Sequence, residues 1–90
     1  MSWSARIAGP GRKELAKLDR KARSNILNFL RKRIATDEDP RRFGNPLRHN
    51  LTGLWKYRVD AFRVIADIQD QEVTVLIVRV GHKSKVYGEY

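Results

Sequence analysis

Apolar and polar residues alternate most regularly in the last third of the chain. Over residues 55–59 the alternation is strict, so Lys56 and Arg58 lie on one face of a strand and the residues between them lie on the other. The same pattern resumes after Asp60-Ala61 and again after Asp70-Gln71, which we predict to be tight turns. The sequence therefore predicts three consecutive strands at residues 55–59, 62–69 and 72–80.

The first half of the chain is predicted to contain one strand and two helices. The strand spans residues 3–8, and a short helix follows over residues 12–18. Asp19 is the expected N-cap of a second, longer helix. Pro40 ends this helix, and residues 39–53 are predicted to form a loop. The apolar residues of the longer helix recur at helical spacing and comprise Ala22, Ile26, Leu27, Phe29, Leu30 and Ile34.

These elements predict a single α+β domain over residues 1–90. The expected order is β-α-α-β-β-β, with two helices packed on one face of a small, mainly antiparallel sheet. Gly81 is expected to end the sheet, so that residues 82–90 form a tail or a short C-terminal helix. The opposite face of the sheet is left uncovered, and an apolar partner element or the folded-back tail could cover its aliphatic residues. These residues are expected to be Ile65, Leu76 and Val78.

The composition is strongly basic, with a formal net charge of +9. Residues 1–35 contain ten Lys and Arg against Glu14 and Asp19, a net charge of +8. Such a charge attracts polyanions, although a solvated helix surface would have the same composition. The absence of cysteine excludes disulfides and thiolate metal sites. Because no long apolar run predicts a membrane span or signal peptide, we expect a cytoplasmic protein.

The turn at Asp60-Ala61 brings basic residues together. If it is a two-residue loop, Arg58 lies directly opposite Arg63. Like charges that face each other across paired strands cost stability. A surface that combines Lys56, Arg58 and Arg63 therefore indicates an anion-binding site, and phosphate is the anion that we expect there.

Three segments resemble the RelE branch of the RelE/ParE toxin superfamily, the toxins of type II toxin–antitoxin modules. Residues 47–58 contain Leu-Thr-Gly-Leu-Trp-Lys-Tyr-Arg, which is similar to the family's entry into the sheet. Residues 62–65, Phe-Arg-Val-Ile, are similar to its next strand, and residues 80–87, Val-Gly-His-Lys-Ser-Lys-Val-Tyr, to its C-terminal ending. The resemblance covers nearly the whole chain.

This resemblance implies a ribosome-dependent endoribonuclease that cuts messenger RNA in the decoding site. It also implies an acidic antitoxin, RelB-like or of another type, that binds the toxin and silences it. His82 and Lys85 are weaker RNA-binding candidates. The family's cleavage residues correspond to Lys56, Arg58, Arg63, Lys83 and Tyr87. The chain departs from the best-known members at Arg58, where they have lysine, and at Lys83, where they have arginine.

Cleavage of RNA by its own 2′-hydroxyl needs cations at the phosphate, a base for the 2′ proton and an acid for the leaving 5′-oxygen. Arg58 and Arg63 suit the first task, because the guanidinium fork matches phosphate oxygens. Lys56 is the candidate base, because neighbouring positive charge disfavours its protonated form. Lys83 or His82 is the candidate acid. The sequence has no metal-binding spacing or cofactor motif, so metal-independent chemistry is expected.

Two residues and the overall function each have more than one interpretation. Tyr87 either stacks on a base or orients the 2′-hydroxyl, or else it closes the sheet edge as a core residue. His82 either supplies a proton or orders its loop. The alternative function is a ParE-like toxin that inhibits DNA gyrase without catalysis, and a weaker one is a relic that only binds RNA or antitoxin. Clustered cations favour the enzyme.

Overall fold

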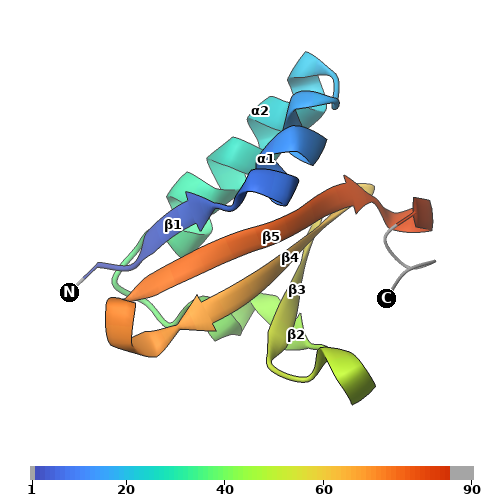
Figure 1. The fold of residues 1–90 in the computed structure, drawn as a ribbon. Coiled ribbons are helices and arrows are strands. Elements are labelled where there is room, and N and C mark those ends of the chain that lie inside the picture. Colours follow the sequence, from blue (N-terminus) through green and yellow to red (C-terminus); the bar gives the residue numbers. More distant parts are fainter. Residues whose placement is uncertain (1, 86–90) are drawn as a thin grey trace.

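The computed structural model describes residues 2–85, and for Asn50 only the backbone. Its centre is a five-stranded sheet in the order β1-β5-β4-β3-β2, with the two main helices gathered on one side (Figure 1). The strands are β1 Ser4–Ile7, β2 Gly44–Pro46, β3 Leu54–Val59, β4 Phe62–Gln69 and β5 Thr74–His82. The helices are α1 Gly9–Ala16 and α2 Arg20–Phe29, and α2 continues as one π-helical turn, Leu30–Ile34. The predicted α+β class is confirmed.

Local residues determine where each of the two main helices begins. The Asp19 carboxylate accepts a hydrogen bond from the backbone N–H of Ala22 at 2.8 Å, which confirms the predicted N-cap. The first helix starts at Gly9, earlier than predicted, because Pro10 fits the first helical turn without losing a hydrogen bond. In the apolar stripe of the second helix, Leu27 is 43% exposed and Phe29 is half-buried, and the other residues are buried.

The first hairpin has the predicted register. Val59 pairs with Phe62 across the two-residue turn, and Arg58 pairs with Arg63. β1 lies parallel to β5 at one edge of the sheet, and all other pairings are antiparallel. The sheet is therefore mainly antiparallel, as predicted.

The prediction of a plain loop over residues 39–53 was wrong. This segment contains the short strand β2 and two 3-10 turns, Pro40–Phe43 and His49–Leu51. Gly44 and Pro46 favour strands poorly, so the sequence carries no strand signal here. The strand forms because the outer edge of β3 is open, and Gly44 can approach it closely: a Cβ at Gly44 would lie 3.0 Å from the Tyr57 ring.

The second turn and the end of the sheet also differ from prediction. In place of a two-residue turn, residues Asp70–Glu72 form a 3-10 turn, and Val73 follows with a φ of 49°. Gln69 pairs with Thr74, so the loop between β4 and β5 spans four residues and not the predicted two. The last strand then runs past Gly81, which pairs with Arg63, to His82.

A bulge on β5 changes which residues reach the open face. Ile65 pairs with Arg79 whereas Ala66 pairs with Ile77, so Val78 is an extra residue on β5. Ile65 is fully buried, although exposure was predicted. The register places Lys56 and Arg79 on either side of Ile65, where long cationic side chains can cover an aliphatic one. Leu76 and Val78 are half-buried.

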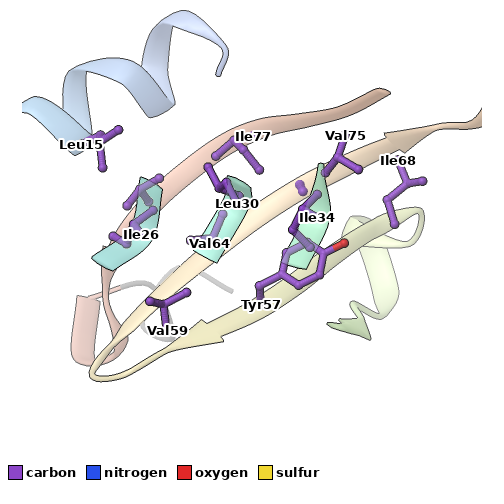
Figure 2. Packing of buried hydrophobic residues seen from close by; sticks show 12 residues of the cluster. Leu15, Ile26, Leu30, Ile34, Tyr57, Val59, Val64, Ile68, Val75 and Ile77 are labelled. Atoms are coloured by element: carbon purple, nitrogen blue, oxygen red, sulfur yellow. The ribbon is translucent and has the colours of Figure 1, made fainter. Parts of the chain in front are cut away.

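The core lies between the helices and the sheet, as Figure 2 shows. Tyr57 is fully buried in this core and packs against Phe29, with ring centroids 5.7 Å apart. Its hydroxyl donates to the Pro40 carbonyl at 2.8 Å. Burial raises the pKa of Tyr57 to about 12, so the phenol stays neutral. The buried cluster comprises Leu15, Ile26, Leu30, Ile34, Tyr57, Val59, Val64, Ala66, Ile68, Val75, Ile77 and Val80.

Within residues 2–85, no helix has both the length and the apolar character that a membrane crossing requires.

Tyr57→Phe should lower the free energy of unfolding by about 1–2 kcal/mol, because it leaves the Pro40 carbonyl without its buried donor. Tyr57→Leu should cost more, since it also removes the ring that packs on Phe29. Urea unfolding of both variants and the wild type measures this difference. Equal stability of Tyr57→Phe and wild type would show that the hydroxyl bond contributes nothing.

Candidate functional site

Three basic residues of the β3–β4 hairpin line one groove. Lys56 and Arg58 from β3 and Arg63 from β4 lie along a cavity of about 360 Å³ together with Phe43 and Asn45. Because Tyr57 and Val59 point into the core, Lys56 and Arg58 lie on the sheet face opposite the helices. The structure thus brings together three of the five predicted cleavage residues, whose role in cleavage stays a prediction.

Phe43 and Asn45 were missed by the sequence analysis. Asn45 pairs with Lys56 across β2 and β3, and paired residues in antiparallel strands point to the same face. Phe43 precedes β2 at the end of the 3-10 turn Pro40–Phe43. The only signal available was an asparagine among glycine and proline, which is typical of a loop.

The three cations have different surroundings. Arg63 is only 4% exposed, and its Nη1 donates to the carbonyls of Asp60 at 3.0 Å and Phe62 at 2.8 Å. These carbonyls offset part of the repulsion that was predicted between Arg58 and Arg63. Lys56 is half-buried and Arg58 is exposed. Arg58 is therefore the most accessible of the three cations.

The residues after the bulge lie close to the same hairpin. The Lys83 backbone N–H donates to the Ala61 carbonyl at 2.8 Å, which ties the exit of β5 to the β3–β4 turn. The Lys83 side chain is exposed. This link brings Lys83 to the end of the sheet that carries Arg58 and Arg63.

His82 belongs to β5 and not to the predicted tail. Its ring packs edge-on against Phe62, with ring centroids 5.7 Å apart, and its Nδ1 accepts from the Ser84 backbone N–H at 3.2 Å. The neutral ring therefore carries its proton on Nε2. His82 and Lys85 line a neighbouring cavity of about 270 Å³, separate from the groove of Lys56. Tyr87, the remaining candidate, lies outside the described residues.

Comparison with known proteins decides the family. The sequence model described as the ParE toxin of the type II toxin–antitoxin system parDE matches residues 6–87. The chain belongs to this toxin family. Toxin RelG of Mycobacterium tuberculosis is 30% identical over 87 residues, which cover 97% of this chain and 98% of that protein. The predicted membership of the RelE/ParE superfamily is therefore confirmed.

Solved toxin structures have the same fold. A chain of the RelBE2 toxin–antitoxin complex of M. tuberculosis is similar with a TM-score of 0.85 and 28% identity, and the match covers 93% of this chain and 94% of that one. The isolated RelE toxin of E. coli is similar with a TM-score of 0.69 and 22% identity, over 97% of this chain and 93% of that one. The latter identity supports the fold alone. These neighbours support the RelE-like branch.

In this toxin, α1 fixes the part of β5 that leads to His82 and Lys83. The Glu14 carboxylate accepts from Arg79 Nε and Nη2, both at 2.9 Å, and from the Val80 backbone N–H at 3.0 Å. β1 pairs with β5 only as far as Ile77, so the Glu14 carboxylate takes the place of a strand beyond that point. Burial alone would raise the pKa of Glu14, but the hydrogen bonds from Arg79 and Val80 and the charge of Arg79 lower it below the usual value of 4.5.

Glu14 should make the stability of this toxin depend on pH. Because its folded-state pKa is below 4.5, the ionised group stabilises the fold above that pH, and this stabilisation is lost as the pH falls through the folded-state pKa. Glu14→Gln should therefore be less stable than wild type at pH 7, and the difference should shrink at pH 3. Urea unfolding across this range measures the effect.

Glu72→Gln is the matched control, because this substitution removes the same charge from an exposed side chain. It should stay close to wild type at both pH values. A gap between wild type and Glu14→Gln that does not change with pH would contradict the assigned ion pair.

Proposed function

We propose that this toxin is a ribosome-dependent endoribonuclease that cuts messenger RNA in the decoding site and so inhibits translation. The observation that carries the proposal is the groove that combines Lys56, Arg58 and Arg63. A protein that only docks on a partner has no need to gather cations on paired strands, where they repel each other. An extended phosphodiester, in contrast, binds best where several cations face one groove.

The proposed reaction is attack of a 2′-hydroxyl on the neighbouring phosphorus. The new O2′–P bond forms as the P–O5′ bond breaks, and charge builds on the non-bridging oxygens. Arg58 binds these oxygens from the exposed side, and Arg63, held by the turn carbonyls, supports them from below. A rigid Arg63 favours catalysis, because it need not reorganise during the reaction.

The protons move between two further groups. Lys56 takes the proton of the 2′-hydroxyl, and Lys83 gives a proton to the departing 5′-oxygen. We choose Lys83 over His82 as the acid because His82 lines the neighbouring cavity and its Nδ1 is already engaged by Ser84. In this proposal Tyr87 orients the 2′-hydroxyl or stacks on a base.

We further propose that an acidic, RelB-like antitoxin silences the toxin by covering the groove. The similar chain from M. tuberculosis belongs to a toxin–antitoxin complex. The net charge of +9 would attract an acidic partner, and a bound carboxylate would compete with phosphate at Arg58.

Arg58→Ala should reduce cleavage of ribosome-bound messenger RNA roughly 100-fold or more, because it removes one donor to the charged transition state. Arg58 is a sharper test than Arg63, whose loss would also break the hydrogen bonds to the turn. Primer extension on translated messenger measures the cuts. Arg20→Ala is the matched control, because Arg20 is an exposed arginine on the helix layer.

Circular dichroism must show that Arg58→Ala is folded. Full cleavage by the folded variant would remove Arg58 from the site. If the wild type cuts nothing but inhibits DNA gyrase, the ParE-like function that the family name suggests is correct.

The chemical groups at the ends of the cleaved RNA should identify the nucleophile. Attack by the 2′-hydroxyl leaves a 2′,3′-cyclic phosphate or 3′-phosphate upstream and a 5′-hydroxyl downstream. Kinase labelling of the downstream fragment without prior phosphatase treatment detects that 5′-hydroxyl. Fragments that need phosphatase first would carry 5′-phosphate ends, which would indicate a water nucleophile.

A further inference from the structure

A second cationic cavity lies between the C-terminal end of α1 and the last residues of β5. Its volume is about 270 Å³, and it is separate from the groove of the β3–β4 hairpin. Basic residues from two distant segments line it. Lys17 is the C-cap of α1, His82 is the last residue of β5, and Lys85 follows shortly after. The fold therefore brings together cations that are far apart in the sequence.

The positive charge of this cavity is not cancelled by its own carboxylate. Glu14 also lines the cavity, but its carboxylate already accepts from Arg79 Nε and Nη2 at 2.9 Å and from the Val80 N–H at 3.0 Å. Lys17 and Lys85 are exposed, and in the described part of the chain neither forms an ion pair with a carboxylate. The cavity therefore keeps two lysine charges that can attract an anion.

His82 adds a directional hydrogen-bond donor to these lysines. Its Nδ1 accepts from the Ser84 backbone N–H at 3.2 Å, so the neutral ring has its N–H at Nε2. The edge-on contact with Phe62 also restricts the ring. A lysine ammonium binds phosphate as a point charge, whereas an imidazole N–H donates along one direction. Together these groups are suited to the oxygens of a phosphate.

One pair of residues separates this cavity from the groove of the β3–β4 hairpin. Gly81 lines the cavity and pairs with Arg63, which lines the groove. Paired residues in antiparallel strands lie about 5 Å apart, so the two sites adjoin. An RNA strand with a phosphate on Arg58 and Arg63 can therefore continue over the end of the sheet into the cavity. This continuity favours RNA over a separate acidic peptide as the ligand.

We propose that this cavity is a second phosphate subsite, in which Lys17, His82 and Lys85 bind a backbone phosphate of the RNA strand next to the phosphate that is cut. The inference rests on the proposed function, because it assigns a further phosphate of the same substrate. Phosphate contacts fix the position of a nucleic acid and carry no base preference. The subsite thus sets where the strand lies and not which codon is cut.

The test measures binding of the full-length chain to diuridylate and tetrauridylate, both 2′-O-methylated to block cleavage and both without terminal phosphates. Lys17→Gln should weaken binding of tetrauridylate about fivefold at low salt, because it removes one cation from the second subsite. Binding of diuridylate, which fills only the groove, should stay within about twofold of wild type. The slope of log affinity against log salt should become shallower by about 0.7 for tetrauridylate, as expected for one phosphate contact on a single strand.

Lys32→Gln is the matched control, because Lys32 is an exposed lysine in the π-helical turn Leu30–Ile34 and does not line the cavity. It removes the same charge from the protein and should bind both probes as wild type does. Lys17→Arg keeps the charge and should also bind tetrauridylate as wild type does. Circular dichroism shows whether each variant is folded.

Four results would overturn the inference. Wild type might bind tetrauridylate no more tightly than diuridylate, or Lys17→Gln might weaken both probes alike. Equal weakening by Lys17→Gln and Lys32→Gln would show an effect of net charge only. Unchanged binding of tetrauridylate by Lys17→Gln, together with weaker binding of tetraglutamate, would assign the cavity to an acidic protein partner.

Primer extension on translated messenger separates this inference from the proposed function. If the wild type cuts nothing but binds tetrauridylate through Lys17, the nuclease function fails and the phosphate subsite stands. If the wild type cuts messenger and Lys17→Gln binds tetrauridylate as wild type does, the nuclease function stands and the subsite fails.

Discussion

The register of the β3–β4 hairpin is the constraint on which the rest of the structure depends. It places Tyr57 in the core and Lys56 and Arg58 on the opposite face. A shift of one residue would turn every side chain of β3 to the other face. The core would then receive two cations, which is costly unless they are paired, and the tyrosine would lose its bond to the Pro40 carbonyl. Core packing and the cationic groove are therefore specified by the same pairing.

Asp60 stabilises this register through contacts with both the helix layer and the sheet. It adopts a φ of 54°, in the left-handed region that the turn requires. Its carboxylate accepts from Asn25 of α2 at 3.1 Å, and its carbonyl accepts from Arg63 at 3.0 Å. The turn is thus joined to the helix layer on one side and to the base of the groove on the other. A second link from Lys83 to Ala61 brings the end of β5 to the same turn.

The positive charge of the groove is tolerated because its members are held in different ways. Arg63 is buried against backbone carbonyls, whereas Arg58 reaches solvent, so the two charges that face each other are not equally exposed. Glu14 neutralises Arg79 nearby and also satisfies a backbone N–H on β5. The edge of β5 beyond the end of β1 therefore keeps a hydrogen-bond partner at Val80.

The hairpin and the helix cap could be predicted from the sequence because their causes are local. Strict alternation of apolar and polar residues predicted β3. The two-residue turn at Asp60-Ala61 placed Arg58 opposite Arg63. Asp19 stands directly before the apolar stripe of the second helix and caps it. These features need only neighbouring residues. The same local signals placed Lys56, Arg58 and Arg63 in one candidate site, and the resemblance to a toxin family predicted a role for them in RNA cleavage.

Only the tertiary structure decided what borders that site. β2 forms because β3 offers an open edge and Gly44 can pack on Tyr57, a contact between residues separated along the chain. The bulge at Val78 and the 3-10 turn before Thr74 depend on how β5 fits against β4 and β1 at once. Phe43, Asn45 and the buried Ile65 follow from these pairings. Short-range patterns cannot specify them, because a strand with weak propensity is stabilised by the partner that it meets.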